Sequence, residues 1–309
     1  MINGRSNPGE YTEMSRLPQQ LVLFEHLLQE GEEAENGGRD EGTADGKFGD
    51  MLIPFAYEET LCRDVGLGTA PPALHLWSHP GGVALGLRDS KLPCARPAMQ
   101  KLEEEQGFRT AVRHSGGAAV PLDAGIVNVS LILPKSRGKL DFHDDFRLLA
   151  SLITEAVAVT HPLAAAQIEA GEITHSYCPG DFDLAIGGRK FCGIAQRRQS
   201  HAYFVHAFVV IAGSGQQRGE LIRRFYEDAA CGEEGLSYPD VRPETIGGLG
   251  ELGGPETTEA FAAGIRQALI QRGVTLQPAS ALAQETGYTL EYGDIRVLEA
   301  ARVLRERYS

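Results

Sequence analysis

The dipeptide Gly187-Gly188 separates two short runs in which apolar and polar residues alternate. Two glycines between such runs are typical of a tight β-hairpin, because glycine readily adopts the positive φ angles that its turn needs. The hairpin predicts three cross-strand pairs: Ile186 with Arg189, Ala185 with Lys190, and Asp183 with Cys192. The fold must therefore contain an antiparallel sheet at this point.

The alternation also divides the hairpin into two faces. The apolar face comprises Phe182, Leu184, Ile186, Phe191 and Ala195. The polar face comprises Asp181, Asp183, Lys190, Cys192 and Gln196. A solvated sheet face is the common interpretation of such a pattern, and Lys190 is expected on it.

A cysteine precedes the hairpin in the segment Ser176-Tyr177-Cys178-Pro179-Gly180-Asp181-Phe182. A straight strand would place its thiol roughly 20 Å from Lys190, so Pro179-Gly180 is expected to form a type II turn that brings the chain back. Pro179 also favours an extended Cys178. An ammonium near the sulfur would favour the nucleophilic thiolate, provided that Asp181 and Asp183 are farther away. Cys178 and Lys190 are thus candidates for acyl-transfer chemistry.

The rest of the chain indicates a mixed α and β protein. Strands are expected at 73–78, 82–87, 109–114 and 126–133, and helices at 97–106, 141–160 with Asp141 as N-cap, 255–272 and 294–308. We expect an N-terminal extension over 1–30 with a short helix at 17–28, and an acidic, glycine-rich flexible insert over 31–50. A catalytic domain over 51–231 and a C-terminal helical appendage over 232–309 complete the expected organisation.

Composition excludes several classes of function. The net charge of −13 disfavours nucleic acid and anionic membranes as partners. The longest apolar stretch, 202–213, is too short to span a bilayer, and the N-terminus lacks the features of a secretory signal, so a cytoplasmic protein is expected. The five cysteines are odd in number and form no CxxC pair, which predicts free thiols and no zinc or other metal site.

Two segments resemble the superfamily of lipoate ligases and octanoyltransferases, whose catalytic domain is shared with biotin ligases. They are Arg113-His114-Ser115-Gly116-Gly117-Ala118-Ala119-Val120, followed by Asp123, Gly125 and Asn128-Val129-Ser130-Leu131, and Gly188-Arg189-Lys190-Phe191-Cys192-Gly193-Ile194-Ala195-Gln196. The resemblance spans about residues 50–230. It implies an α+β fold of the biotin/lipoate ligase type, with a mixed, largely antiparallel sheet packed with helices.

The resemblance also implies roles for single residues. Lys190 matches the lysine that contacts the acyl carbonyl. The acyl-binding segment would comprise Arg113, His114, Ser115, Gly116, Gly117, Ala118, Asp123 and Asn128. The glycines allow the backbone to approach a ligand closely, and their N–H groups could bind the acyl oxygen.

Within the superfamily, residues 176–183 resemble the octanoyltransferases that take octanoyl from the glycine cleavage H protein, and Cys178 matches their acyl-thioester nucleophile. The resemblance implies octanoylated H protein as donor, lipoyl domains of 2-oxoacid dehydrogenases as acceptor, and no cofactor. Alternatives are acyl carrier protein as donor, ATP-dependent lipoate ligation, and a non-catalytic lipoyl-domain binder. Ligases have an arginine-asparagine-aspartate stretch in place of the cysteine, usually three glycines at 116–118 and an arginine at His114, so the sequence disfavours ATP chemistry.

The remaining candidates have simpler interpretations. Cys192 is a rival nucleophile on the predicted face of Lys190, but a small buried thiol is the commoner role, and the same applies to Cys62, Cys94 and Cys231. Arg197 and Arg198 could meet acidic lipoyl domains or belong to a solvated edge. His79 and His114 are not assigned to catalysis.

Overall fold

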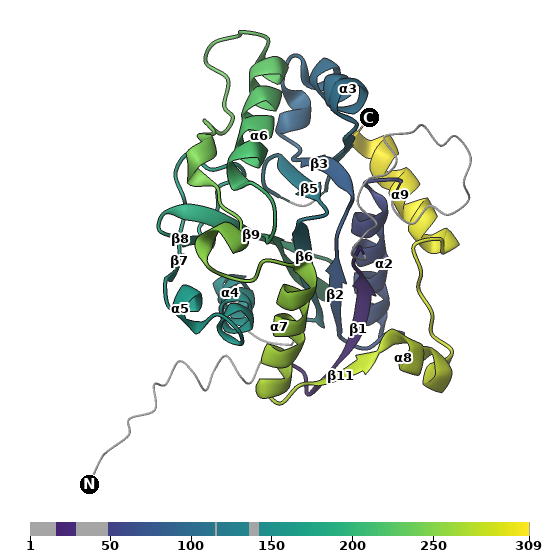
Figure 1. Cartoon of the computed structure of the whole chain (residues 1–309). Coiled ribbons are helices and arrows are strands. Elements are labelled where there is room, and N and C mark those ends of the chain that lie inside the picture. Colours follow the sequence, from purple (N-terminus) through teal and green to yellow (C-terminus); the bar gives the residue numbers. More distant parts are fainter. Residues whose placement is uncertain (1–16, 29–48, 115, 136–141, 309) are drawn as a thin grey trace.

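The computed structural model describes residues 17–28, 49–114, 116–135 and 142–308. Within these residues a large sheet of eight strands has the order β11-β1-β2-β6-β10-β9-β8-β7, and a small sheet has the order β4-β3-β5 (Figure 1). Strands β11, β1 and β2 run parallel to one another. Every later neighbouring pair in this order, beginning with β2 and β6, is antiparallel. The expected mixed, largely antiparallel sheet is therefore confirmed.

The strands of the large sheet are β1 (Gln20–His26), β2 (Ala73–Trp77), β6 (Ile126–Pro134), β7 (Ile168–Ala170), β8 (Leu184–Ile186), β9 (Arg189–Arg198), β10 (Ala202–Val210) and β11 (Thr275–Pro278). The small sheet contains β3 (Gly81–Leu85), β4 (Arg109–Val112) and β5 (Val120–Asp123). The α-helices are α2 (Ile53–Leu67), α3 (Ala95–Gln106), α4 (Phe142–Ala158), α5 (Pro162–Ala165), α6 (Gly215–Ala230), α7 (Thr258–Gln271), α8 (Ala279–Thr286) and α9 (Ile295–Tyr308). Short 3₁₀ turns cover η1 (Asp89–Lys91), η2 (Pro243–Thr245) and η3 (Gly250–Leu252).

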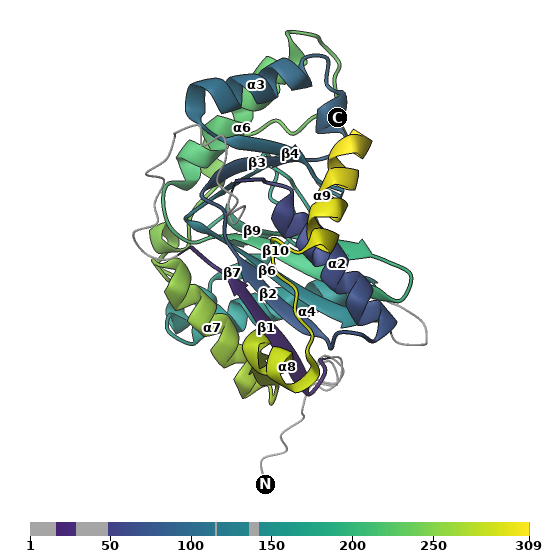
Figure 2. The ribbon, with the colours of Figure 1, turned by 90° about the vertical axis from the view of Figure 1, so that its right-hand side faces the viewer.

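Helices cover both faces of the large sheet. Helices α2 and α9 pack together on one face, α4 and α7 lie on the other, and α3 and α6 lie beside the small sheet (Figure 2). Strand β10 is buried along its whole length: Phe204 and Phe208 join the core under α2, while Val205 and Val209 join the core under α4. A strand covered on both faces is apolar at nearly every position. None of the described helices is both long and apolar enough to cross a bilayer.

Most of the expected elements are confirmed. The strands expected at 73–78, 82–87, 109–114 and 126–133 correspond to β2, β3, β4 and β6, and the expected helices to α3, α4, α7 and α9. The helix expected over 17–28 is wrong, because Gln20–His26 form strand β1 between β2 and β11. Leu21 is buried on one side of the sheet and Val22 on the other, so a short apolar run here marks a strand with two covered faces.

Other expected features lie outside the described residues or differ in detail. Nearly all of the acidic insert at 31–50, and the expected N-cap Asp141, lie outside the described residues. The segment 232–309 contains helices as expected, and it also provides strand β11, which pairs in parallel with β1. Its helix α7 packs against α4, and α9 packs against α2.

The hairpin forms as predicted at its turn but carries a β-bulge. Ile186 pairs with Arg189 and Ala185 with Lys190, which confirms two of the three predicted pairs. The third is wrong, because Leu184 and not Asp183 pairs with Cys192, and this leaves one extra residue in β9. The extra residue reverses which side the following positions face.

The bulge changes the environment of Cys192. This cysteine packs with Phe191 in the core under α4, so its expected place on the face of Lys190 is wrong. Burial raises the pKa of the Cys192 thiol well above its usual range. Gly193 takes the place beside Lys190, with the Lys190 Cε only 3.3 Å from where a Cβ of Gly193 would lie. Cys192 is therefore a buried, inert thiol, as its simpler interpretation had it.

The expectation that all cysteines are free is wrong for two of them. Cys94 and Cys231 form a disulfide with their Cα atoms 5.9 Å apart, and it joins the start of α3 to the end of α6. Cys94 N–H also donates to the Ala229 carbonyl oxygen at 2.9 Å. The two cysteines are separated by 137 residues, so spacing along the sequence gave no sign of the pair.

Candidate active site

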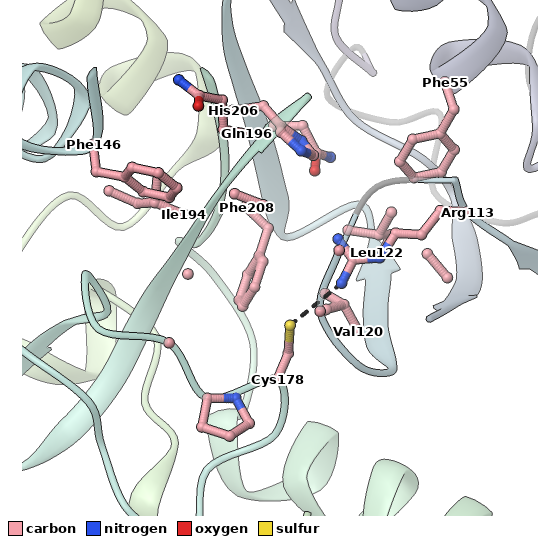
Figure 3. Close-up of a pocket in the computed structure, with 18 residues that line it drawn as sticks. Phe55, Arg113, Val120, Leu122, Phe146, Cys178, Ile194, Gln196, His206 and Phe208 are labelled. Carbon is pink, nitrogen blue, oxygen red and sulfur yellow. Dashed lines mark hydrogen bonds between the residues drawn. The ribbon is translucent and has the colours of Figure 1, made fainter. Parts of the chain in front are cut away.

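A cavity of about 290 Å³ lies between the small sheet and strands β6, β10 and β9 of the large sheet (Figure 3). Five of the ten catalytic and acyl-binding residues predicted from the sequence line it: Arg113, Gly116, Gly117, Asn128 and Cys178. Its apolar walls come from Phe55, Val120, Leu122, Phe146, Ile194 and Phe208. A small, mostly apolar cavity with a few convergent polar groups is typical of a small-molecule site.

Cys178 has a backbone conformation that side chains seldom adopt. Its φ is +46°, so the extended conformation expected before Pro179 is wrong. The expected type II turn at Pro179-Gly180 does not form either, because the turn lies two residues later, where Asp183 N–H donates to the Gly180 carbonyl oxygen at 3.1 Å. A left-handed non-glycine residue costs about 1–3 kcal/mol and persists only where its surroundings hold it.

Lys190 provides much of that support. Its side chain is 1% exposed, and its ammonium donates to the carbonyl oxygens of Tyr177 at 3.0 Å and Cys178 at 2.6 Å. The ammonium also pairs with Asp183 Oδ2 at 2.8 Å. An ammonium has three donors, and these contacts use all of them. The expectation of a solvated face is therefore wrong for Lys190 and Asp183, which form a buried clamp around the cysteine loop.

Asp183 is the acidic half of this clamp. Burial raises the pKa of its carboxyl to about 6, although the Lys190 ammonium and the Gly180 N–H both favour the charged form. Gly180 N–H donates to Asp183 Oδ2 at 3.1 Å, so one carboxylate oxygen binds both the lysine and the loop. The carboxylate thus points at Lys190 and Gly180.

The sulfur of Cys178 is contacted by two hydrogen-bond donors, and neither of them belongs to Lys190. Arg113 Nη2 lies 3.3 Å from Sγ, and Ala118 N–H donates to Sγ at 3.2 Å (Figure 3). Arg113 Nη2 also donates to the Ala118 carbonyl oxygen at 2.8 Å, which fixes the guanidinium against the loop. A cation and an amide N–H around a sulfur complement its anionic form. The cation that contacts the sulfur is therefore Arg113, whereas Lys190 contacts the carbonyl of the same residue.

Gly117 makes this approach possible. Its φ is +101°, and a Cβ there would lie 2.5 Å from Arg113 Nη2 and 2.7 Å from Cys178 Sγ. Neighbouring Gly116 has open space where its Cβ would be. Only the second glycine of the pair is required by its backbone and its contacts.

Of the other predicted acyl-binding residues, His114 and Asp123 lie outside the cavity lining, whereas Asn128 belongs to it. His114 is buried and bonds to Glu59 through Nε2. Asp123 forms a bidentate pair with Arg218, at 2.8 and 2.6 Å. Asn128 lines the cavity, with its Nδ2 at 3.4 Å from the Trp77 carbonyl oxygen. Ser115 lies outside the described residues.

The two arginines after the lysine strand have partners within the chain. Arg197 donates to Glu59 at 2.7 Å, and Arg198 pairs with Asp145 at 3.1 Å. Burial alone would raise the pKa of Glu59, but hydrogen bonds and charges from His114 and Arg197 lower it to about 2. Both arginines thus help to fix α2 and α4 to the sheet edge.

Sequence reasoning missed several cavity residues on β9 and β10. His206 and Phe208 alternate along β10 and face the cavity, as do Gly193 and Ala195 on β9. Burial lowers the pKa of His206 to about 4, and its Nε2 has no hydrogen-bond partner among the residues that the structure describes. A histidine in the otherwise apolar run 202–210 was the signal available, since β10 lies beside the lysine strand.

Comparison with known proteins places this geometry in a family context. A family described as "Lipoyl protein ligase A/B catalytic domain" matches residues 50–239. An octanoyl-[GcvH]:protein N-octanoyltransferase from Anoxybacillus flavithermus is 41% identical over 75% of this chain and 82% of its own length. A lipoyl-[GcvH]:protein N-lipoyltransferase from Listeria monocytogenes is 39% identical over 66% of this chain and 72% of its own.

Solved structures agree on the fold. A lipoate-protein ligase A bound with ATP matches with a TM-score of 0.61 and 17% identity, over 94% of this chain and 95% of its own. A bipartite lipoate protein ligase from Thermoplasma acidophilum matches with a TM-score of 0.55 and 17% identity, over 94% of this chain and 93% of its own. The expected lipoate-ligase type of α+β fold is thus confirmed.

Proposed function

The chain belongs to the lipoyl protein ligase A/B catalytic domain family, and from this premise we propose that it is a cysteine-dependent protein N-octanoyltransferase. It takes an octanoyl group from a lysine of the glycine cleavage H protein and passes it to a lysine of a lipoyl domain. The acyl-[GcvH] donor appears in the names of relatives that are about 40% identical over two thirds or more of this chain. The lipoyl-domain acceptor follows from the resemblance of residues 176–183.

The observation that carries the proposal is the environment of one sulfur. Cys178 is the one free cysteine that is partly exposed, and it lines the cavity. Its Sγ receives hydrogen bonds from Arg113 and from the Ala118 amide. A thiol that is accessible and surrounded by donors has the features of a nucleophile, whereas Cys62 and Cys192 are buried.

In the first step Cys178 attacks the carbonyl carbon of the octanoyl amide on the donor lysine. A carbon–sulfur bond forms, the carbon–nitrogen bond breaks, and the proton given up by the thiol ends on the departing lysine amine. As sulfur loses its negative charge, the donors on Arg113 and Ala118 can turn to the carbonyl oxygen, which is two bonds from the sulfur. Removing one such donor typically slows catalysis about 10²- to 10³-fold.

In the second step the neutral amine of the acceptor lysine attacks the thioester. A carbon–nitrogen bond forms, the carbon–sulfur bond breaks, and the proton lost by the amine returns to the sulfur. The reaction exchanges one lysine amide for another, so no ATP is required. The apolar walls formed by Val120, Leu122 and Phe208 suit the hydrocarbon chain, and the Lys190–Asp183 clamp keeps the cysteine loop in place.

Intact-protein mass spectrometry tests the proposal. After incubation with octanoylated H protein and no nucleotide, we expect the enzyme to gain one octanoyl group that hydroxylamine removes, and a lipoyl domain added later to receive it. Cys178→Ala should gain none. An adduct on that variant, or none on the wild type, contradicts the proposal.

Parallel reactions distinguish the alternatives. Octanoyl-acyl carrier protein tests the other donor, and lipoylated H protein tests the acyl group named for the Listeria relative. Modification of the lipoyl domain that requires free acid and ATP would identify a ligase instead.

A further inference from the structure

A buried hydrogen-bond chain lies behind the loop that faces the sulfur. The Tyr226 hydroxyl, from α6, receives a hydrogen bond from Ala119 N–H at 3.0 Å and donates to Asp89 Oδ1 at 3.1 Å. The other oxygen of Asp89 receives the N–H of Gly86 at 2.7 Å. Asp89 is 3% exposed and Tyr226 is 1% exposed. Neither residue lines the cavity.

The chain ends one residue from a donor to the nucleophile. Ala119, whose N–H meets Tyr226, follows Ala118, whose N–H meets Cys178 Sγ. Arg113 is bound to the same loop through the Ala118 carbonyl oxygen. The position of this short stretch therefore decides whether both donors reach the sulfur.

Close packing supports the same stretch from the side of the small sheet. A Cβ on Gly86 would lie 2.0 Å from the Gly117 carbonyl oxygen, so the loop rests directly on the backbone of Gly86. That backbone is in turn bound to Asp89. The loop is thus held at two neighbouring points, at Gly117 by close packing on Gly86 and at Ala119 by the hydrogen bond to Tyr226.

Burying a carboxylate costs free energy, but the two oxygens of Asp89 accept hydrogen bonds from Gly86 and Tyr226. Burial raises the pKa of Asp89, while the Gly86 N–H, the Tyr226 hydroxyl and the charge of Arg113 favour the ionised form. An apolar pair of the same shape would fill the space without fixing the loop. The polar pair instead gives the Ala119 N–H a partner of defined direction.

We propose that Asp89 and Tyr226 are positioning residues that hold the 116–119 loop so that the Ala118 amide and the Arg113 guanidinium both meet the sulfur of Cys178. The inference rests on the proposed function in taking Cys178 as the nucleophile. It extends the site to two side chains that lie outside the cavity.

Tyr226→Phe tests this, because it removes only the hydroxyl and keeps the ring. The readout is the rate of alkylation of Cys178 by iodoacetamide at pH 7, located by peptide mass spectrometry, which needs no acyl substrate. We expect a fall of about tenfold, which is about the net contribution of one ordinary hydrogen bond. The rate of acyl-enzyme formation should fall with it, while the KM for the donor protein stays the same.

Tyr57→Phe is the matched control. Its ring is also fully buried, and its hydroxyl donates to the Leu290 carbonyl oxygen at 3.3 Å. The aromatic rings that contact it belong to Phe24, His26, His75 and Tyr292, and none of these residues is part of the loop. We expect this variant to lose stability without a change in the alkylation rate. Continued protection of Cys62 and Cys192 shows that each variant is folded.

Asp89→Asn and Asp89→Ala provide the rescue test. Asparagine can still accept from Gly86 N–H and donate to the Tyr226 oxygen, so most of the rate should return, whereas alanine should match Tyr226→Phe. A wild-type alkylation rate in Tyr226→Phe, or an equal loss in Tyr57→Phe, overturns the proposal. If alkylation responds as expected but the wild type forms no acyl-enzyme, the proposed function fails and the positioning role remains.

Discussion

Replacing Gly117 by alanine should strongly slow acyl transfer while leaving the fold in place. The new methyl group would lie 2.5 Å from Arg113 Nη2 and 2.7 Å from Cys178 Sγ, about 1 Å closer than favourable contact allows. The φ of +101° is also unfavourable for alanine, at about 1–2 kcal/mol. The loop or the guanidinium must therefore move away from the sulfur.

The magnitude follows from the contacts that such a movement breaks. Sγ loses one or both of its donors, Arg113 and the Ala118 amide. Because one donor at such a site is worth about 10²- to 10³-fold, we expect acyl-enzyme formation to slow at least about 100-fold. The free energy of unfolding should fall by only about 1–3 kcal/mol, since the loop is partly exposed.

Gly116→Ala is the matched control, because no heavy atom of the described residues, its chain neighbours aside, lies within 4 Å of the added methyl group. Rapid-quench mass spectrometry with octanoylated H protein measures the single-turnover rate of both variants, and circular dichroism checks their fold. The reasoning is refuted if Gly117→Ala is acylated at the wild-type rate, or if Gly116→Ala is slowed as much.

Three further predictions concern stability. Reduction of the Cys94–Cys231 disulfide, which spans 137 residues, should lower the free energy of unfolding by up to about 5 kcal/mol. Wild-type melting should therefore respond to dithiothreitol and Cys231→Gly melting should not; a wild type that ignores reductant contradicts this. Burial lowers the pKa of His79 from the usual 6.5 to about 4 in the folded protein. Between these two pH values the unfolded chain binds a proton at His79 and the folded chain does not, so the free energy of unfolding falls as the pH drops from 6.5 to about 4. His79→Asn should remove about 2 kcal/mol of the loss between pH 7 and pH 5 in urea titrations, and equal pH dependence in the two proteins would exclude this origin. Residues 1–231 alone should aggregate, because they lack β11, α7 and α9, and a monomeric, cooperatively melting fragment on gel filtration would count against that view.

The sequence predicted those parts of the fold that depend on local patterns. The glycine pair gave the hairpin turn and its first two strand pairs, because glycine conformations and alternation act over a few residues. Strand β1 was mistaken for a helix, since a four-residue apolar run has no distinctive period when both faces are covered. The bulge at β9 was not predictable, because the packing of Phe191 and Cys192 under α4 decides it.

The sequence identified several residues of the site but not the contacts between them. Cys178 and Lys190 do lie together, but the ammonium contacts a carbonyl oxygen, and Arg113 approaches the sulfur instead. Arg113 lies 65 residues before the cysteine, so only the folded chain brings them together. The role of Tyr226 could not be predicted for the same reason, because its hydroxyl accepts a hydrogen bond from Ala119, which lies 107 residues away in the sequence.

The distribution of sulfur in this chain offers a route to its complexes. Two thiols are enclosed in the core and two are joined to each other, which leaves Cys178 as a unique attachment point in the natural sequence. A carrier protein with cysteine in place of its modified lysine could be coupled there by a mixed disulfide. Such a conjugate would trap the donor or acceptor in its docked position, ready for structure determination, without any change to the enzyme.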